Sequence, residues 1–440
     1  MKKLFVLLVC ATIVLSACTG PAPTQKVEAT TASVEEPSPA PVSLRFSAWG
    51  NTDQLAAIAN IVTAFREKYP NIEISEEYDP YDGYWEKKTT QIAGSTLPDV
   101  FAIASDYVCD YSSAGLLSNL NDTFAAGTPT ADYLTGLPQQ ALANLNVDGV
   151  QVGYPFAGGA LLLYYNKDML DKAGLEYPNP DWTLQDVLTA AAKLSVDTNQ
   201  DGELEQWGYM PNYLTIEDFD AIMHRFGARW FSEDGKTALS NSPEAVKAIQ
   251  FLQDIIWTNK VSPRPQDIEG VDCPFCAGFV AMYEDGTWFM SDARDITDFA
   301  WDVTSIPLGF EGQQAGGPLL GNPNFVVFSK TQHLEESKLL AAFMASPEGQ
   351  AILGEARGRM PVQTVGLTAW GSTPPDNIGV IADILATQPT IRESLCVKHF
   401  VEFTDLQYRT LEGEILTNNT PAAQLMPGFT QEIQKILDTP

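Results

Sequence analysis

The chain has 440 residues, of which 45% are apolar, 10% aromatic and 19% charged, a composition typical of a folded protein. Its 56 acidic residues outnumber its 26 basic ones and give a net charge of −30. This balance argues against nucleic-acid binding, which needs clustered Lys and Arg to neutralise phosphates, and it disfavours a tightly held polyanionic ligand.

The N-terminus has the layout of a secretory signal. Lys2 and Lys3 precede an apolar run over residues 4–14, which is too short to span a membrane. The run closes with Leu15-Ser16-Ala17-Cys18, which resembles the bacterial lipobox, where the cysteine after the cut is diacylated and becomes the new N-terminus. We therefore expect residues 1–17 to be removed and Cys18 to carry lipid; the alternative is an ordinary exported protein in which Cys18 is incidental.

Residues 18–42 are expected to hold the lipidated cysteine and a tether. The stretch after Cys18 contains five prolines and no aromatic residue, so it cannot bury enough apolar area to offset its ordering entropy. We expect a disordered or partly extended segment that keeps the folded body outside the cytoplasm, at the cell surface or in the periplasm. The lipid on Cys18 would be its only membrane anchor.

The body begins at Ser43 with a regular succession of strand and helix patterns. Alternating Leu44, Phe46 and Ala48 predict a half-buried strand, and the helical spacing of apolar residues that follows stops before Pro70. The first predicted elements are a strand over 44–48, a helix over 55–65, a strand over 72–74, a helix over 82–92 and a buried strand over 100–103.

Two later helix starts carry capping signals. Thr183 with Asp186 resembles a capping box, and Ser242 followed by Pro243 places proline in the first turn. Alternation of strands and helices predicts parallel sheets covered by helices, so the fold class is α/β. The body is too long for one hydrophobic core, which predicts two lobes or domains.

The order of the motifs along the body resembles the extracellular solute-binding proteins of ABC importers, in the carbohydrate-binding branch (family 1) that includes maltose-binding protein. Each motif is weak alone, but together they cover nearly all of the body in the same order. They are Ala48-Trp49-Gly50-Asn51, Phe65-Arg66-Glu67-Lys68-Tyr69-Pro70, Leu97-Pro98-Asp99-Val100-Phe101, Ala114-Gly115-Leu116-Leu117, Tyr154-Pro155-Phe156, Leu163-Tyr164-Tyr165-Asn166-Lys167-Asp168-Met169-Leu170, Ala173-Gly174-Leu175, Trp182-Thr183, Ala281-Met282, Gly286-Thr287-Trp288 and Ser346-Pro347-Glu348-Gly349-Gln350.

The resemblance implies a two-lobed periplasmic-binding-protein fold of type II, with ligand held between lobes at the carboxyl ends of strands. The chain would cross between lobes three times, near Pro155, Pro307 and Pro361. The N-lobe would then comprise residues 43–155 and 308–360, and the C-lobe residues 156–307 and 361–440. Hinge closure on a sugar would be recognised by the permease subunits with their cytoplasmic ATPase. The protein is expected to be a monomer.

A sugar-binding cleft needs aromatic rings for the apolar sugar faces. Trp288 is the first candidate, because it matches a family position whose indole lies against a sugar ring; the alternative is a core tryptophan. The full aromatic set is Trp49, Tyr154, Phe156, Trp230 and Trp288.

Polar groups are needed for the sugar hydroxyls. Gly316 and Gly317 would let backbone amides approach closely, although Pro318 follows where the family often has an aromatic residue. Arg359, near the third crossing, would either bind hydroxyls or close an ion pair between lobes. The carboxylate and amide candidates are Asn51, Asp53, Asp106 and Glu284.

An acidic segment matches the first half of a calcium loop, where alternate side chains face inward and Gly202 turns the chain. The twelfth position is Gly208, so the usual bidentate Glu is missing. A structural calcium ion and a metal-free acidic turn both remain open. The candidate ligands are Asp197, Asn199, Asp201, Glu203 and Glu205.

Four cysteines lie in the body, and export favours their oxidation. Cys273 and Cys276 form a C-x-x-C pair with no second such pair to complete a zinc site, so a local disulfide is expected. Whether Cys109 pairs with Cys396 stays open.

Enzyme signatures are missing from the sequence. There is no phosphate-binding glycine loop, no G-x-S-x-G elbow and no H-E-x-x-H helix, and the three histidines have no metal-ligand spacing. We therefore expect no enzymatic activity and no required cofactor. A surface-tethered glycan hydrolase using paired carboxylates is the alternative of another class. A binder of a polyamine or other small solute is the alternative within the same fold.

Overall fold

The computed structural model describes residues 41–211, 216–314, 318–320, 322–388, 397 and 399–439. The predicted signal and Cys18 fall outside this range, as do nearly all of the tether, Gly316, Gly317 and Cys396. In the part of the chain that is described, no helix combines the length and the apolar character that a membrane span requires.

One sheet has five strands in the order β2-β1-β3-β12-β6. β1 pairs in parallel with β2 and β3, whereas β12 runs antiparallel to both β3 and β6. The strands are β1 (Val42–Trp49), β2 (Ile72–Asp79), β3 (Val100–Ile103), β6 (Gly153–Pro155) and β12 (Asn324–Val327).

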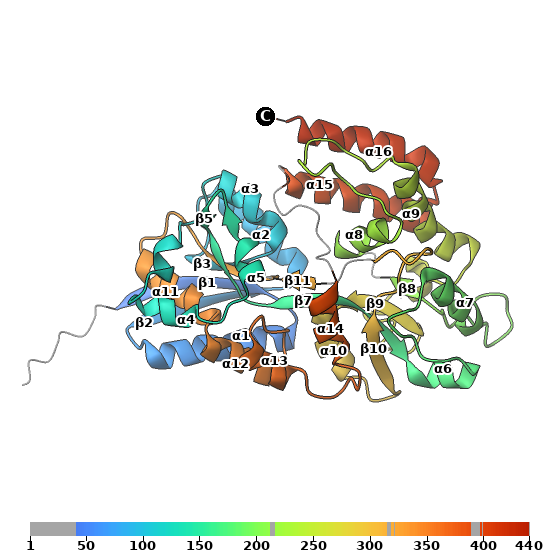
Figure 1. Cartoon of the computed structure of the whole chain (residues 1–440), viewed down its shortest axis with the longest axis horizontal. Helices are drawn as coiled ribbons and strands as arrows, with labels where there is room; N and C mark the ends of the chain where they lie inside the picture. The colour runs from blue at the N-terminus through green and yellow to red at the C-terminus, as the bar shows by residue number, and fades with distance from the viewer. Residues whose placement is uncertain are drawn as a thin grey trace, which may run out of the picture. The chain divides into compact units, whose positions relative to one another are not determined.

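The first sheet is covered on both faces. Leu44, Phe46 and Ala48 of β1 pack with the apolar side of α1 (Thr52–Lys68), while Phe101 and Ile103 of β3 belong to a second, smaller core on the opposite face. α1 and α12 (Pro347–Ala356) lie on one face, and α2 (Tyr81–Ala93) and α3 (Val108–Ser113) on the other (Figure 1). The predicted strand and helix order is confirmed here, with β2 longer than expected. The remaining elements of this part are α4 (Pro129–Tyr133), α5 (Gln139–Ala143), β4 (Asn146–Val147), β5 (Val150–Gln151) and α11 (Leu334–Met344).

A second sheet has the order β10-β7-β9-β8. Its central strand β7 is antiparallel to both neighbours, and only β8 and β9 pair in parallel. The expectation of parallel sheets is therefore wrong for the second sheet. The neighbours of β7 in this sheet, β9 and β10, run in the direction opposite to β7. The strands are β7 (Gly158–Asn166), β8 (Met210–Pro211), β9 (Met282–Gly286) and β10 (Trp301–Ser305).

Two cores flank the second sheet. The larger one gathers α7 (Leu184–Leu194), α8 (Ile216–Arg225), α9 (Pro243–Gln253), α15 (Phe400–Gln407) and α16 (Ala422–Leu437). The capping signals of α7 and α9 are confirmed: Thr183 and Asp186 form a capping box, and Ser242 accepts from the Ala245 amide. The smaller core includes α10 (Met290–Arg294) and α14 (Val380–Thr387), and α6 (Lys167–Ala173) packs against α7. α13 (Thr364–Trp370) adds Trp370 to this core but packs mainly against α12.

We call the first sheet with its helices the first lobe, and the second sheet with its helices the second lobe. Three segments between them lie side by side: the Gly158 amide donates to the Met360 carbonyl over 2.9 Å, and the Asn322 amide to the Ala157 carbonyl over 2.8 Å. These contacts lie close to Pro155 and Pro361, where the sequence places two of the crossings, and the crossings themselves stay predictions.

The crossing inferred near Pro307 lies further along the chain. Leu308 still pairs with Thr183, and the Phe310 ring contacts Phe226 in the second lobe. Strand β11 (Pro318–Leu320) then pairs with β7, and β12 enters the first sheet at Asn324. The boundary at residue 308 is therefore too early, because Leu308 and Phe310 still contact residues of the second lobe.

Candidate ligand-binding site

The candidate site is built on the carboxyl ends of β1 and β3 in the first lobe, where open α/β sheets usually bind ligands. Trp49 ends β1, and Asn51 caps the N-terminus of α1 by accepting the Gln54 amide over 3.0 Å. Asp106 follows β3 in the short 3₁₀ turn η1 (Ser105–Tyr107), where it is buried. Asp53 is exposed in the first turn of α1. The turn residues predicted from sequence are thus brought to one edge of the sheet.

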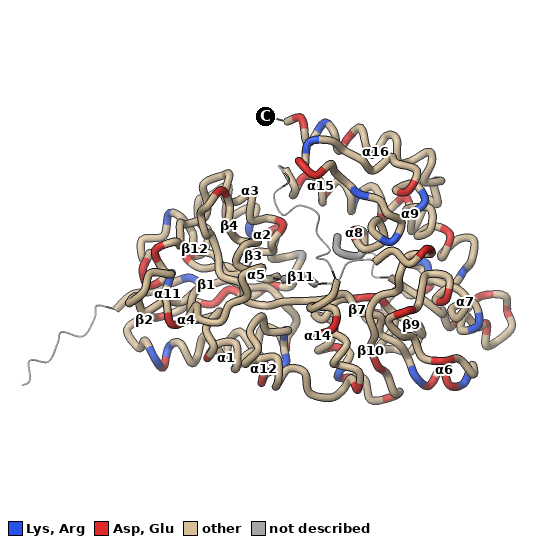
Figure 2. Tube along the Cα trace, viewed as in Figure 1, with Lys and Arg blue, Asp and Glu red and all other residues tan. Residues whose placement is uncertain are grey.

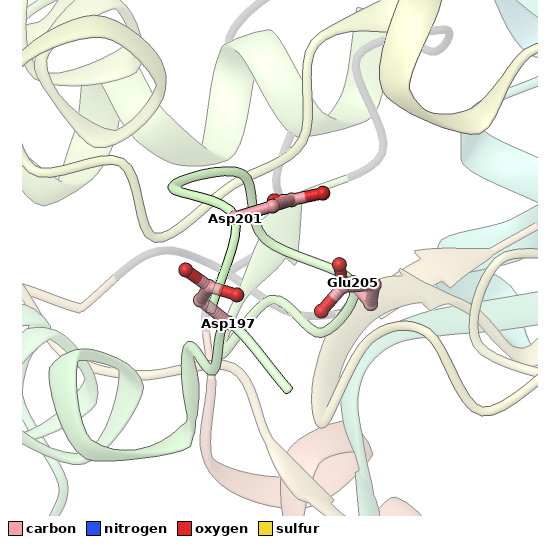
Figure 3. Close-up of side chains that lie close together, drawn as sticks. All are labelled: Asp197, Asp201 and Glu205. Atoms are coloured by element: carbon pink, nitrogen blue, oxygen red, sulfur yellow. The ribbon is translucent and has the colours of Figure 1, made fainter. Parts of the chain in front are cut away.

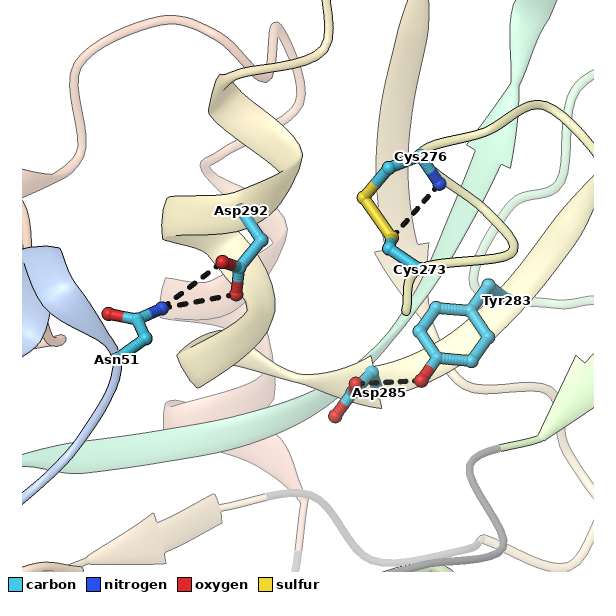
Figure 4. Close-up of a disulfide and its surroundings, with 6 residues drawn as sticks. All are labelled: Asn51, Cys273, Cys276, Tyr283, Asp285 and Asp292. Carbon is cyan, nitrogen blue, oxygen red and sulfur yellow. Dashed lines mark hydrogen bonds between the residues drawn. A yellow bond between two sulfur atoms is a disulfide. The ribbon is translucent and has the colours of Figure 1, made fainter. Parts of the chain in front are cut away.

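The same turn reaches the second lobe. The Asn51 amide nitrogen lies 3.1 Å from Ser291 Oγ and 3.2 Å from each carboxylate oxygen of Asp292, on α10 (Figure 4). Nearby, Gln54 Nε2 donates to the Trp288 carbonyl over 3.1 Å. The start of α1 and the Trp288 segment therefore face one another across the two lobes.

Trp288 lies in the 3₁₀ turn η5 (Thr287–Phe289) between β9 and α10 and is half-buried. Its ring covers Gly286 so closely that a Cβ there would lie 2.3 Å from a ring carbon. The ring also packs against a small cluster of Leu161, Ala221 and Ile306. Position 286 therefore requires glycine. The packing of the Trp288 indole fixes its orientation before any ligand binds.

Trp49 and four further aromatic rings form a cluster, which we call the aromatic platform. The Trp49 ring centroid is 5.7 Å from that of Tyr81 and 5.4 Å from that of Trp85, and Trp85 stacks on Tyr107 at 3.8 Å. Tyr81 is 46% exposed, whereas Trp49 and Tyr84 are buried and Trp85 and Tyr107 are half-buried. The members of the platform are Trp49, Tyr81, Tyr84, Trp85 and Tyr107.

Sequence reasoning identified only Trp49 in this cluster. A usable signal was present: Tyr81, Tyr84 and Trp85 have the i, i+3, i+4 spacing that places side chains on one side of a helix. The contribution of Tyr107 depends on the fold, because it joins the others only when β1 and β3 pair.

Arg359 is 6% exposed and donates from Nη2 to the Trp49 carbonyl over 2.8 Å. Among the described residues no carboxylate lies within ion-pair distance of it, and burial lowers its pKa to about 10. The predicted ion pair between lobes is therefore not seen in the described part of the chain. Arg359 instead connects the third crossing to the end of β1, and its Nη2 would be 3.1 Å from a Cβ at Gly50.

Four of the predicted ligand-binding residues are core residues instead. The Tyr154 hydroxyl donates to Thr123 Oγ1 over 2.8 Å inside the first lobe, and Phe156 packs on Phe325. Trp230 is 3% exposed, and its indole nitrogen donates to Asp220 over 2.7 Å. These aromatic side chains sit in the lobe interiors because the strands and loops that carry them are covered by helices.

Glu284, the fourth of these residues, forms a fully buried ion pair. Its two carboxylate oxygens accept from Arg225 over 2.8 and 2.9 Å, and the Tyr209 hydroxyl donates to one of them over 2.6 Å. Although burial opposes it, the charge of Glu284 raises the pKa of Arg225. Period-two alternation along β9 turns Glu284 towards the large core, so its carboxylate stabilises the second lobe and is not available to a ligand.

The predicted calcium loop closes on itself (Figure 3). One oxygen from each of Asp197, Asp201 and Glu205 lies within 4.8 Å of the others. Asp197 accepts from the amides of Gln200 and Gly202, and Glu205 accepts from the Thr198 amide over 2.7 Å. The predicted ligand Asn199 donates to Glu205, while Glu203 turns outward to Arg264 at 3.6 Å. These bonds are those of an Asx-rich turn, and the carboxylate oxygens that remain close suit a hard cation.

The predicted disulfide between Cys273 and Cys276 is present, close to Tyr283 and Asp285 of β9 (Figure 4). Tyr283 donates to Asp285 over 3.0 Å. Cys109 is also disulfide-bonded, whereas Cys396 lies outside the described residues. Asp and Glu positions are spread along elements of both lobes (Figure 2), in keeping with the net charge of −30.

The chain matches the family model of the bacterial extracellular solute-binding proteins over residues 48–351. A putative binding protein of Brucella abortus is 24% identical over 305 residues, which cover 68% of this chain and 71% of the relative. The sn-glycerol-3-phosphate-binding periplasmic protein of Escherichia coli is 27% identical over 221 residues, which cover 49% of each chain.

Solved structures agree on the fold. An ABC substrate-binding protein from Listeria monocytogenes, solved in complex with cycloalternan, superposes with a TM-score of 0.80 at 25% identity, covering 90% of this chain and 98% of that one. The maltose/maltodextrin-binding domain from Bdellovibrio bacteriovorus, bound to maltotriose, has a TM-score of 0.74 at 20% identity, with 90% and 99% covered. The family model matches more than half of the chain, and the two-lobed α/β architecture agrees with it. This chain therefore belongs to the bacterial extracellular solute-binding protein family.

Proposed function

We propose that this protein is the receptor of an ABC importer, which binds a neutral sugar or oligosaccharide between its lobes and delivers it to the permease by hinge closure. The observation that carries the proposal is that each lobe brings aromatic rings close to the contact between the start of α1 and the Trp288 segment. The aromatic platform stands on the first lobe, and Trp288 stands on the second, opposite the start of α1.

The chemistry of this pair suits a carbohydrate. Sugar rings present apolar faces that pack on aromatic rings and hydroxyls that need fixed donors and acceptors. Asn51, Asp53 and Asp106 supply polar groups at the edge of the platform. The resemblance to a cycloalternan-binding protein at 25% identity supports a glucose oligomer or cyclic oligosaccharide as the ligand class.

We propose further that the mature protein is held at the membrane by lipid on Cys18. The lipobox-like end of the signal supports this, as does the proline-rich stretch that follows. Metabolic labelling with a radioactive fatty acid should mark the wild-type protein and leave Cys18→Ala unlabelled. Equal labelling of the variant would contradict lipidation at this cysteine.

One competing ligand class has a specific observation behind it. The relatives that bind sn-glycerol-3-phosphate share 27% identity over half of the chain, and Arg359 is a buried cation beside the site. However, Arg359 already donates a hydrogen bond to the Trp49 carbonyl, and the net charge of −30 disfavours an anionic ligand. A phosphate ester is therefore the second candidate, and the binding assay must include it.

A thermal-unfolding screen of the mature protein tests the proposal. A ligand that binds only the folded state stabilises it by about 2.7 kcal/mol at a hundred times its dissociation constant, which shifts the midpoint measurably. We expect cycloalternan or maltotriose to raise the midpoint, and sn-glycerol-3-phosphate and spermidine to leave it unchanged. Chromatography of the sugar after incubation should show no shortened product, whereas sugar consumption would favour the glycan hydrolase.

A further inference from the structure

A short segment, residues 371–376, connects a helix that packs on the first lobe to residues that pair with the second. The helix is α13, which lies so close to α12 that a Cβ at Gly354 would be 2.1 Å from the Gly366 carbonyl oxygen. Beyond the segment, the side-chain amide of Asn377 donates to the Val303 carbonyl of β10 over 2.9 Å. The two ends of the segment are therefore attached to different lobes.

Arg294, on α10 of the second lobe, binds carbonyl oxygens at the start of this segment. Its Nη2 lies 2.6 Å from the Trp370 carbonyl and 3.2 Å from that of Ser372, and its Nε lies 3.0 Å from that of Pro374. The guanidinium also lies over the Trp370 ring, 5.1 Å from its centroid. The second lobe thus holds the end of α13 and the segment through one side chain.

Arg357, at the C-terminal end of α12, reaches the same carbonyls from the first lobe. Its Nη2 lies 3.2 Å from the Ser372 carbonyl, 3.3 Å from that of Thr373 and 3.5 Å from that of Pro374. Two guanidiniums, one from each lobe, therefore share the carbonyls of Ser372 and Pro374. Burial and the neighbouring charge of Arg357 lower the pKa of Arg294 to about 10, so the two like charges stay together against their mutual repulsion.

The backbone of Arg357 gives independent support for a role of its side chain. Its φ is 58°, in the left-handed region, where glycine is the common residue at the end of a helix. The local conformation alone would therefore favour glycine. A strained position whose side chain binds another segment points to the side chain as the reason for arginine there.

We propose that Arg294 and Arg357 are positioning residues for lobe closure, and that with the carbonyls of residues 370–374 they form a clasp between the lobes. In the same arrangement the lobes also touch through Asn51 and Asp292, and Asp292 lies two residues before Arg294 on α10. Separation of the lobes moves α10 away from α12, and the two arginines then cannot both keep the shared carbonyls. The clasp therefore stabilises the arrangement in which the lobes touch.

The clasp rests on the proposed function only in that closure delivers the ligand, and it acts on the lobes rather than on the ligand. Its loss should weaken every ligand that requires closure by the same factor. For the loss of one or two hydrogen bonds we expect a decrease in affinity of about threefold to tenfold.

Arg357→Gly is the first test, because it removes the guanidinium and relieves the left-handed backbone, so the variant should fold. Small-angle scattering of the ligand-free protein should show a larger radius of gyration for the variant than for the wild type. An unchanged radius of gyration would overturn the clasp.

Arg294→Gln should increase the radius of gyration to the same extent. The double variant Arg294→Gln/Arg357→Gly should open no further than Arg357→Gly alone, because either substitution breaks the one clasp. The matched control is Arg45→Gln, since Arg45 donates to the Thr96 carbonyl over 2.8 Å and pairs with Glu77 within the first lobe. This control should keep the wild-type radius of gyration.

An additive increase in the double variant would show that the arginines act separately, and an equal increase in the control would show an unspecific effect; either result would overturn the clasp. If Arg294→Gln fails to fold, Arg357→Gly with its control decides. Scattering without sugar keeps this test apart from the proposed function. Failure of the wild-type protein to bind any sugar would contradict the receptor proposal, whereas an unchanged radius of gyration overturns the clasp even if sugar binds.

Discussion

The side-chain amide of Asn51 in the first lobe lies 3.2 Å from both carboxylate oxygens of Asp292 in the second lobe. The other end of the same amide accepts the Gln54 backbone amide and so caps α1. One side chain therefore fixes the start of α1 and reaches across to the second lobe. Separation of the lobes at this point must break the contact with Asp292 while the cap stays in place.

Asp292→Ala should favour the open arrangement and leave the stability of α1 nearly unchanged, because the Asn51 cap is retained. Asp292 is exposed, and an exposed contact of a charged side chain contributes about 0–1 kcal/mol, so we expect sugar affinity to fall by at most about fivefold. Calorimetric titration measures the affinity, with Asp295→Ala as the control on an exposed carboxylate of the same segment. Wild-type affinity in Asp292→Ala would show that this contact does not assist closure.

Trp288→Ala should weaken sugar binding by about ten- to a hundredfold, since burying an aromatic side chain against a sugar face contributes about 1.5–3 kcal/mol. The control is Trp182→Ala, because Trp182 packs at the edge of the large core beside the start of α7. That variant should lose stability but keep its affinity. If the two variants bind sugar equally well, Trp288 is a packing residue of the second lobe.

Tyr81→Ala tests the aromatic platform, because this substitution removes the exposed ring of the platform. We expect a loss of affinity of about tenfold with little change in stability, since the ring is 46% exposed. Tyr177→Ala is a suitable control, because Tyr177 is 36% exposed and donates to Asp171 on α6, away from the platform. An unchanged titration with Tyr81→Ala would exclude this ring from the ligand site.

The sequence predicted local features better than those that depend on the fold. Periodicity and capping residues located α1, α7 and α9, because these signals depend on neighbours a few positions away. The antiparallel pairing of β7 involves strands that are distant in the sequence, so no local pattern of residues predicts it.

In the candidate site, too, local features could be predicted from the sequence, whereas contacts between distant residues could not. Asn51 was found because it lies in a strand–helix turn, but its partner Asp292 is 241 positions away. Trp230 and Glu284 have the residue types of a sugar site, and only the packing of the second lobe reveals that Asp220 and Arg225 engage them. Residue type alone cannot separate a buried polar pair from a ligand-binding group.

Lys88 makes the free energy of unfolding depend on pH, and this effect is separate from ligand binding. It is fully buried in the first lobe, where Nζ donates to Ser47 and Gln91, and burial lowers its pKa from 10.5 to about 8. Between pH 8 and pH 10 the unfolded chain keeps the proton that the folded protein releases, so the free energy of unfolding should rise with pH.

Urea unfolding at pH 7.5 and 9.5 measures this effect. Each unit of pKa difference corresponds to about 1.4 kcal/mol, so the wild-type protein should gain about 1 to 2 kcal/mol relative to Lys88→Met over this range. The comparison with the variant cancels the titration of other groups. An equal pH response of the two proteins would mean that Lys88 titrates normally.

Calcium binding to the loop over residues 197–205 remains a prediction of the sequence. Because the bidentate Glu of the twelfth position is replaced by Gly208, we expect a weak site with a dissociation constant of about 0.1 to 1 mM. Titration calorimetry after chelator treatment should show heat with calcium, and Asp197→Asn combined with Asp201→Asn should remove it. Absence of heat in the wild-type protein would identify the loop as a metal-free Asx turn.

The most direct test of the sugar-receptor account is calorimetric titration of the mature protein with cycloalternan, maltotriose, sn-glycerol-3-phosphate and spermidine, combined with small-angle scattering of each mixture. The account predicts that one of the two sugars binds with one-to-one stoichiometry, decreases the radius of gyration as the lobes close, and is recovered intact. Binding of the phosphate ester or the polyamine, with no heat from either sugar, would contradict the carbohydrate assignment.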